Sequence, residues 1–295
     1  MDKIKFDRNF EPPFGTAVAL SPLIRRITCN NPSPFTFKGT NTFIVGHGNI
    51  AIIDPGPDDE VHLAALLNAV RGETVSHILI THTHMDHSPL ATKLRAATGA
   101  KTYSAISPVK STVISDIRLD ASVDNEFMPD VSLSDSDVVE GKDWALEAVF
   151  TPGHMSNHMS FSLNAEKALL VGDHVMAWAT TVVAPPDGNM NDYMGSLRKL
   201  LKRDEAIYYP AHGPEKRKPL ALVRAILAHR KMREEGIFNR VKAGDGTIGE
   251  IVATIYADVD PRMHAAAGLS TLAHLEQLME KGRIEVRDGR YFSRK

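Results

Sequence analysis

Cysteine is almost absent from this sequence, since Cys29 is the only one among 295 residues. The chain therefore cannot close an intramolecular disulfide, which excludes a disulfide-stabilised fold and fits a reducing compartment. No run approaches the roughly 20 apolar residues that a membrane-spanning helix needs, and residues 1–5 lack the apolar stretch of a secretory signal. We therefore expect a cytoplasmic protein without membrane contact.

Strong charge of one sign is also lacking. The formal net charge is −2, with 24% charged and 43% hydrophobic residues, which is ordinary for a globular protein. Nothing in this balance attracts the chain as a whole to nucleic acid or to a membrane. A length of 295 residues is sufficient for one large core or for two domains.

Short apolar runs that end in Gly, Pro or Asp alternate with helical patterns through most of the chain, which predicts an α/β fold. Residues 46–49 indicate a hairpin between the first two runs. Asp58 or Asp59 is expected to cap the first helix, because an aspartate side chain accepts from free backbone N–H groups there. We expect strands at 42–46, 50–54, 75–80, 144–150, 159–163, 168–172 and 207–210, and helices at 61–70, 89–98 and 194–203.

The character of the chain changes after residue 218. Helical patterns cover 219–242, the residues after Thr247 and 269–281, and Asp288-Gly289 indicates a hairpin between two short alternating runs. Three helices and a terminal hairpin are the outline of a winged helix. We therefore predict two domains, residues 1–218 and 219–295, and expect the second to serve in packing or in assembly of a homo-oligomer.

Residues 81–87, which read Thr-His-Thr-His-Met-Asp-His, are the most informative segment. His82, His84, Asp86 and His87 place three imidazoles and one carboxylate directly after an expected buried strand. The C-terminal ends of strands are where α/β folds usually build their sites. Imidazole nitrogen and carboxylate oxygen are the ligands expected of zinc, and they also suit iron or manganese. The segment therefore predicts a metal site.

Three later strands each end at one further candidate ligand, beside Gly or Pro: His154, Asp173 and His212. The complete set of five imidazoles and two carboxylates is sufficient for two metal ions with an oxygen bridge. One ion would be held by His82, His84 and His154, the other by Asp86, His87 and His212, and Asp173 would bridge the two.

Two such ions would support hydrolysis without a serine or cysteine nucleophile. A bound metal lowers the pKa of water toward neutrality, so that hydroxide exists at pH 7. A pair of ions can hold this nucleophile and polarise the substrate oxygen together. We therefore expect two divalent metal ions, with zinc favoured over iron and manganese, and a structural role for Cys29.

The order of these pieces resembles the metallo-β-lactamase superfamily. Residues 82–87 match its H-x-H-x-D-H signature, and the accessory segments 52–56, 151–154, 172–173 and 211–213 follow in the family's order. The resemblance covers residues 15–215 and implies an αββα sandwich with a di-metal site on one edge of the paired sheets. It also implies a hydrolase, usually with zinc.

The resemblance implies roles for residues around the ligands as well. Asp54 corresponds to an aspartate that supports the ligand histidines, which need an oxygen partner on their other ring nitrogen; the alternative is a carboxylate that caps the following turn. His158 is expected to contact substrate or to donate a proton to it, and the alternative is a polar residue at the rim. Asp86, Asp54 and His158 are therefore the expected catalytic residues.

A narrower resemblance bears on the substrate. Segments 31–36, 39–42 and 228–235, together with the winged-helix-like end, resemble the branch named β-lactamase-like protein 2, which includes a mitochondrial endoribonuclease acting on single-stranded RNA. Bacterial members of that branch are described only as metallo-hydrolases.

Three functions therefore stay open. We expect a small ester, thioester or related substrate. Cleavage of single-stranded RNA is the first alternative, although the acidic segment 104–140 would repel phosphates and residues 219–295 hold only 13 Lys and Arg against 10 Asp and Glu. The second is a winged-helix binding or assembly protein with a non-catalytic metal domain, which the intact set of seven ligands disfavours.

Overall fold

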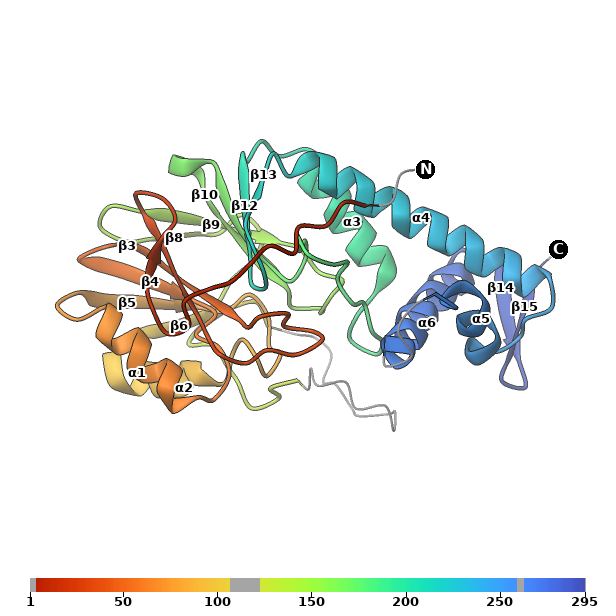
Figure 1. Cartoon of the computed structure of the whole chain (residues 1–295), viewed down its shortest axis with the longest axis horizontal. Coiled ribbons are helices and arrows are strands. Elements are labelled where there is room, and N and C mark those ends of the chain that lie inside the picture. The colour runs from red at the N-terminus through yellow and green to blue at the C-terminus, as the bar shows by residue number, and fades with distance from the viewer. Residues whose placement is uncertain (1–3, 107–122, 259–262, 295) are drawn as a thin grey trace.

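A computed structural model describes residues 4–106, 123–258 and 263–294 of the chain. Two β-sheets face each other, helices cover their outer faces, and a smaller helical part with a two-stranded hairpin lies at the C-terminal end (Figure 1). This arrangement confirms the expected α/β fold, an αββα sandwich followed by a winged-helix-like part. Residues 107–122 of the acidic segment 104–140 lie outside the described residues.

The first sheet contains seven strands whose spatial order is their order in the sequence. Neighbouring strands are antiparallel up to the fourth strand and parallel from there on. The predicted hairpin turns at Gly48, where φ is +69° and glycine avoids the strain of a side chain. The strands are β1 (Val18–Ala19), β2 (Ile24–Thr28), β3 (Asn41–His47), β4 (Asn49–Ile53), β5 (Thr74–Leu79), β6 (Lys101–Ser104) and β7 (Val131–Ser132).

Helices α1 (Glu60–Ala69) and α2 (Leu90–Thr98) cover the outer face of the first sheet (Figure 1). Asp59 caps α1, because its side chain accepts from the backbone N–H groups of Val61 and His62. Leu66 of α1 and Leu94 of α2 pack in one apolar cluster with strand residues that include Ile52 and Ile78.

The second sheet has six strands in the order β13-β12-β11-β10-β9-β8. Helix α3 (Met190–Leu200) contributes to the layer outside it, and a short 3-10 helix, η1 (Asn164–Glu166), joins two of its strands. The strands are β8 (Val138–Glu140), β9 (Ala145–Phe150), β10 (Met159–Leu163), β11 (Ala168–Gly172), β12 (Ile207–Pro210) and β13 (Lys216–Arg217).

The main core lies between the two sheets. Phe43 and Leu79 of the first sheet pack in one buried cluster with Phe161 and Leu170 of the second. Burying such side chains contributes about 1.5–3 kcal/mol each relative to leaving them in water. The facing sheets therefore hold each other in a fixed position, and with them the loops that follow their strands.

The C-terminal part consists of α4 (Leu220–Lys242), α5 (Ile248–Ile255), α6 (His264–Glu280) and the hairpin of β14 (Ile284–Arg287) and β15 (Arg290–Ser293). Thr247 and Glu250 form a capping box at the start of α5. The long helix α4 connects two clusters: Val223 and Ile226 pack with α3 and the second sheet, whereas Ile237 packs with α5, α6 and β14. Figure 1 shows α4 running from the sandwich to the hairpin.

Several elements differ from the prediction. Helix α3 begins at Met190 rather than residue 194, because Asn189 caps it by accepting from the N–H of Asp192. Helix α6 begins at His264 rather than 269, where consecutive alanines favour helix without forming an apolar stripe. The prediction also missed the four edge strands, β1, β7, β8 and β13, and two inner strands, β2 and β6. Two arginines hide the apolar pattern of β2.

Among the helices in the described part of the chain, none combines the length and the apolarity that crossing a membrane requires.

Phe161→Ala tests the core between the sheets. The substitution removes a fully buried ring, and it should lower the free energy of unfolding by about 3–5 kcal/mol, measured by urea unfolding. Val138→Ala on the exposed side of β8 is the control and should change that free energy by less than about 0.5 kcal/mol. Similar values for the two variants would contradict this assignment of the core.

Candidate metal centre

All seven predicted ligands meet at one edge of the sandwich, beyond the C-terminal ends of four strands. His82, His84, Asp86 and His87 follow β5, and the other three follow strands of the second sheet: His154 after β9, Asp173 after β11 and His212 after β12. Because the two sheets pack face to face, ligands up to 130 positions apart in the sequence come together here.

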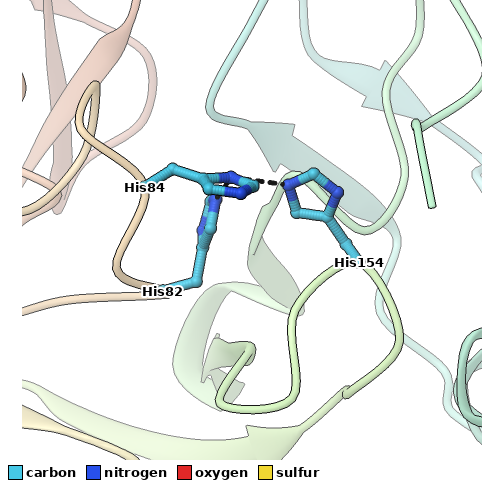
Figure 2. Close-up of side chains that lie close together, drawn as sticks. All are labelled: His82, His84 and His154. Atoms are coloured by element: carbon cyan, nitrogen blue, oxygen red, sulfur yellow. Dashed lines mark hydrogen bonds between the residues drawn. The ribbon is translucent and has the colours of Figure 1, made fainter. Parts of the chain in front are cut away.

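The first group consists of His82, His84 and His154 (Figure 2). The Nδ1 atom of His84 lies 2.9 Å from Nε2 of His82 and 3.0 Å from Nε2 of His154. Each pair of rings is oriented edge to face, with centroids 4.6–4.9 Å apart. Three imidazole nitrogens therefore converge on one small volume.

The second group consists of Asp86, His87 and His212. Oδ2 of Asp86 lies 3.4 Å from Nε2 of His87 and 3.2 Å from Nε2 of His212. This group contains two nitrogens and one carboxylate, whereas the first contains nitrogens alone.

Asp173 lies between the two groups. Its Oδ1 is 3.3 Å from Nε2 of His212, and its Oδ2 is 3.6 Å from Nε2 of His154 and 3.8 Å from Nε2 of His87. One carboxylate therefore faces both groups, as a bridging ligand must.

Four of the histidines are held from outside through Nδ1. His154 donates to the carbonyl of Val182 at 2.6 Å, and His212 donates to the carbonyl of Gly39 at 3.1 Å. His82 donates to Thr81 Oγ1 at 3.0 Å. A proton fixed on Nδ1 leaves the Nε2 lone pair free on the inner side of each ring, which is the arrangement of metal-binding histidines.

Asp54 supplies the fourth of these outer contacts. Its Oδ2 accepts from His87 Nδ1 at 3.0 Å and from Thr81 Oγ1 at 2.7 Å, and its Oδ1 accepts from the Thr81 N–H at 2.7 Å. The Thr81 hydroxyl gives its proton to Asp54, so its oxygen is free to accept from His82. One buried carboxylate therefore orients ligands of both groups.

His158 is fully buried below Asp173 and has both ring nitrogens engaged. Its Nε2 accepts from the N–H of Asp173 at 3.1 Å, and its Nδ1 is 2.9 Å from Thr151 Oγ1. Gly172 makes room for the ring, because a Cβ there would lie 2.6 Å from His158 Nε2. The ring therefore supports the Asp173 backbone, and both of its nitrogens are engaged within the chain.

Burial and mutual repulsion keep the first group neutral. Burial, followed by repulsion from neighbouring imidazoles, lowers the pKa of His82 well below its usual range and that of His84 to about 3. Burial also lowers the pKa of His154, although Asp173 opposes the shift. Neutral rings present lone pairs, so this group is ready to bind a cation.

The second group behaves in the opposite way. Burial disfavours the charged form of His212, but Asp173 and Asp86 overcome it and raise its pKa to about 10. Burial likewise opposes a raised pKa at His87, where Asp86, Asp173 and Asp54 outweigh it. The carboxylates therefore attract positive charge to this place, and a divalent cation would supply that charge in place of the two protons.

The residues present fit divalent cations. His87 Nε2 and Asp173 Oδ1 are buried and find no hydrogen-bond partner in the described part of the chain, although both face the centre. Such orphaned atoms cost free energy unless something binds them. The donor atoms within each group lie within 4.8 Å of one another, and their imidazole and carboxylate chemistry suits zinc, iron or manganese.

A cavity of about 100 Å³ lies beside the first group. Thr83, between two of the ligands in sequence, lines it, and Asn157 donates to Thr83 Oγ1 at 3.1 Å. Val123, which forms an isolated antiparallel β-bridge with His84, also lines the cavity. The remaining lining residues are mostly apolar: Ala105, Ile106, Asp124, Asn125, Phe127, Met128 and Pro129.

The sequence did not predict the hydroxyl and the backbone carbonyls that hold the ligand histidines from outside. Thr81 stands directly before His82, so its place in the motif could have indicated it. The carbonyls of Gly39 and Val182 carry no signal in the sequence, since any residue supplies one. His174 is buried and follows Asp173 in the sequence, but it belongs to none of the ligand groups found among the described residues.

Comparison with known families identifies two segments. Residues 35–212 match the family described as the Metallo-beta-lactamase superfamily, and residues 247–291 match the Beta-lactamase associated winged helix domain. The first match spans the seven predicted ligands.

Individual proteins are similar over nearly the whole chain. The Beta-lactamase-like protein 2 homolog of Caenorhabditis elegans is 31% identical over 271 residues, which cover 90% of this chain and 87% of that protein. The Atrochrysone carboxyl ACP thioesterase of Claviceps purpurea is 25% identical over 272 residues, 87% of this chain and 79% of that protein. A beta-lactamase domain protein from Burkholderia ambifaria has the same fold, with a TM-score of 0.80 and 21% identity over 97% of this chain and 96% of that one.

Asp54→Asn tests the outer contacts of the histidines. The amide keeps the shape of the carboxylate but loses its charge and one acceptor, so the affinity for Zn²⁺ should fall about 10–100-fold in a chelator competition. Asp58→Asn, at an exposed aspartate nearby, should keep the affinity of the unsubstituted protein. Undiminished zinc affinity in the Asp54 variant would contradict the role given to this carboxylate.

Proposed function

The chain belongs to the metallo-beta-lactamase superfamily of hydrolases, and from this premise we propose that it hydrolyses small esters or thioesters with two divalent cations. Zinc is the first choice, with iron and manganese as alternatives. The observation that carries the proposal is the convergence of five imidazoles and two carboxylates on one edge of the sandwich. This set supplies two neighbouring cation positions and needs no protein nucleophile.

In the proposal, one cation position is lined by His82, His84 and His154 and the other by Asp86, His87 and His212, with Asp173 shared. When bound, the cations would lower the pKa of water toward neutrality and polarise the carbonyl of the substrate. The chain's own part is to hold the ligand atoms in place and to exclude competing water from the buried side.

Three further residues have separate tasks in the proposal. Asp54 keeps the proton of His87 on Nδ1, so that Nε2 stays directed at the centre. His158 holds the backbone of Asp173 and is a positioning residue. Asp86, whose side chain is 20% exposed, is the carboxylate of the centre through which a proton can pass to solvent.

The cavity beside the first group supports a small substrate with an apolar part. Its walls include Ile106, Phe127 and Met128, and its size suits a short acyl chain. The buried amide oxygen of Asn157 has no hydrogen-bond partner among the described residues, and it can accept a hydrogen bond from the substrate. The relative named as an acyl carrier protein thioesterase supports a thioester in particular.

Cleavage of single-stranded RNA is the less favoured function. None of the described residues that line the cavity is lysine or arginine, and Asp124 adds negative charge there. Phosphodiester binding depends on neutralising phosphates with basic side chains. The lining of the cavity therefore favours a small substrate over RNA.

We also propose that residues 1–218 form the hydrolase unit and residues 219–295 a winged-helix unit joined to it through α4. The match of residues 247–291 to the associated winged-helix domain supports the second unit, and the separate cluster around Ile237, Ile251 and Leu275 gives it a core of its own.

Asp86→Ala tests the proposed reaction. The rate at which zinc-loaded protein hydrolyses a short-chain acyl thioester is measured by the appearance of the free thiol. This rate should fall more than about 100-fold, because changes to residues outside the ligand set already lower activity about 10–100-fold. Asp204→Ala, at a surface aspartate, should leave the rate unchanged. Cleavage of a single-stranded oligonucleotide that requires Asp86, without any thioester turnover, would replace this proposal with the nuclease.

Removal of metal gives an independent test. Dialysis against EDTA should abolish thioester hydrolysis, and addition of two equivalents of Zn²⁺ should restore it, because the ligand groups stay folded by their outer hydrogen bonds. Circular dichroism before and after dialysis controls for unfolding. Full activity in protein shown by elemental analysis to be metal-free would exclude the proposed mechanism.

A further inference from the structure

Arg230 is an unusual residue in the middle of α4. Only 3% of it is exposed, and no carboxylate among the described residues pairs with it. Its Nε has no hydrogen-bond partner in that part of the chain, and its Nη2 donates to the backbone carbonyl of Thr181. Burying a guanidinium in this way is costly, and an apolar side chain would fill the same space at lower free energy. The contact with Thr181 therefore calls for an explanation.

Thr181 and its neighbour contact the shared residue Asp173 and one residue of the first group, His154. Thr181 Oγ1 donates to the backbone carbonyl of Asp173 at 2.6 Å. The next residue, Val182, accepts the Nδ1–H of His154 through its carbonyl at 2.6 Å. Two consecutive residues of one loop therefore hold the backbone of Asp173 and the ring of His154.

A second contact fixes the same guanidinium. Arg230 lies over the ring of Tyr193 on α3, 5.3 Å from its centroid, which suits a cation–π interaction. The Tyr193 hydroxyl donates to the backbone carbonyl of His174 at 3.0 Å. Arg230 thus contacts both the Thr181 carbonyl and the ring that supports the residue after Asp173.

We infer that Arg230 is a positioning residue through which the C-terminal helix α4 holds the loop that sets His154 and Asp173. The inference rests on the proposed function, since it assigns a role toward the proposed cations. It extends that function by making α4 a part of the centre's support. The winged-helix end of the chain is attached to the helix that carries this contact (Figure 1).

The test compares substitutions along α4 in the full-length protein. Arg230→Met keeps the length and apolar stem but removes the donor, so Zn²⁺ affinity in a chelator competition should fall at least tenfold, as for other partners of metal ligands. The absorption spectrum of the Co²⁺-loaded protein should also change, because His154 and Asp173 lose their fixed orientation.

Arg230→Lys is a second variant, for the case that Arg230→Met does not fold. It retains the charge, but an ammonium group cannot both stack on Tyr193 and reach the Thr181 carbonyl. Zinc affinity should therefore fall several-fold with this variant as well.

Two controls lie on the same helix. Lys231→Met removes an exposed charge next to Arg230 and should leave affinity and spectrum unchanged. Ile226→Ala removes buried apolar surface from the cluster that contains Tyr193, so it should lower the melting temperature but keep the affinity and the Co²⁺ spectrum. This second control separates positioning from a general loss of stability.

Three results would overturn the inference. If the unsubstituted protein binds Zn²⁺, unchanged Zn²⁺ affinity in the folded Arg230 variants would overturn this inference and leave the proposed function standing. An equal loss of affinity in Ile226→Ala would reduce Arg230 to a stability role. Failure of the unsubstituted protein to bind Zn²⁺, Fe²⁺ or Mn²⁺ at all would instead overturn the proposed function, and this inference with it.

Discussion

The centre depends on oxygen atoms that hold histidine rings from outside. Four Nε2 atoms can point into one small buried volume because each Nδ1–H is fixed by Thr81, Asp54, Val182 or Gly39. These acceptors fix the tautomer and the orientation of each ring, as the outer partners of metal-binding histidines do. Asp54 orients more of these rings than any other of the four residues, because its carboxylate holds His87 directly and His82 through the Thr81 hydroxyl.

The rest of the fold supplies these acceptors at fixed positions. The facing sheets bring the end of β5 next to the ends of β9, β11 and β12, and the core between them keeps the edge rigid. The loop after β11 is a different case. No strand in the described part of the chain pairs with Thr181 and Val182, and the loop is fixed instead from α3 and α4. The C-terminal helix thereby becomes part of the support of the centre.

The electrostatics of the two groups are unequal, which has a consequence for chemistry. Neutral imidazoles form the first group, and carboxylates draw positive charge into the second. The first group lies next to the apolar cavity, whereas the second contains Asp86, the more exposed carboxylate. Under the proposed function, substrate would bind and the proton would leave on different sides of Asp173.

The sequence alone determined the class of fold, the winged-helix-like end and the seven candidate ligands, because these leave local signals: apolar periodicity, turn residues and histidines placed at strand ends. Two helices begin earlier than predicted, because a cap at Asn189 and the alanines within residues 264–268 set their starts. Only the tertiary structure decided that His158 supports Asp173, that two backbone carbonyls orient His154 and His212, and that Arg230 reaches the loop beside the centre. The physical reason is that these contacts join residues far apart in the sequence, through carbonyls that every residue has and through side chains whose direction depends on packing.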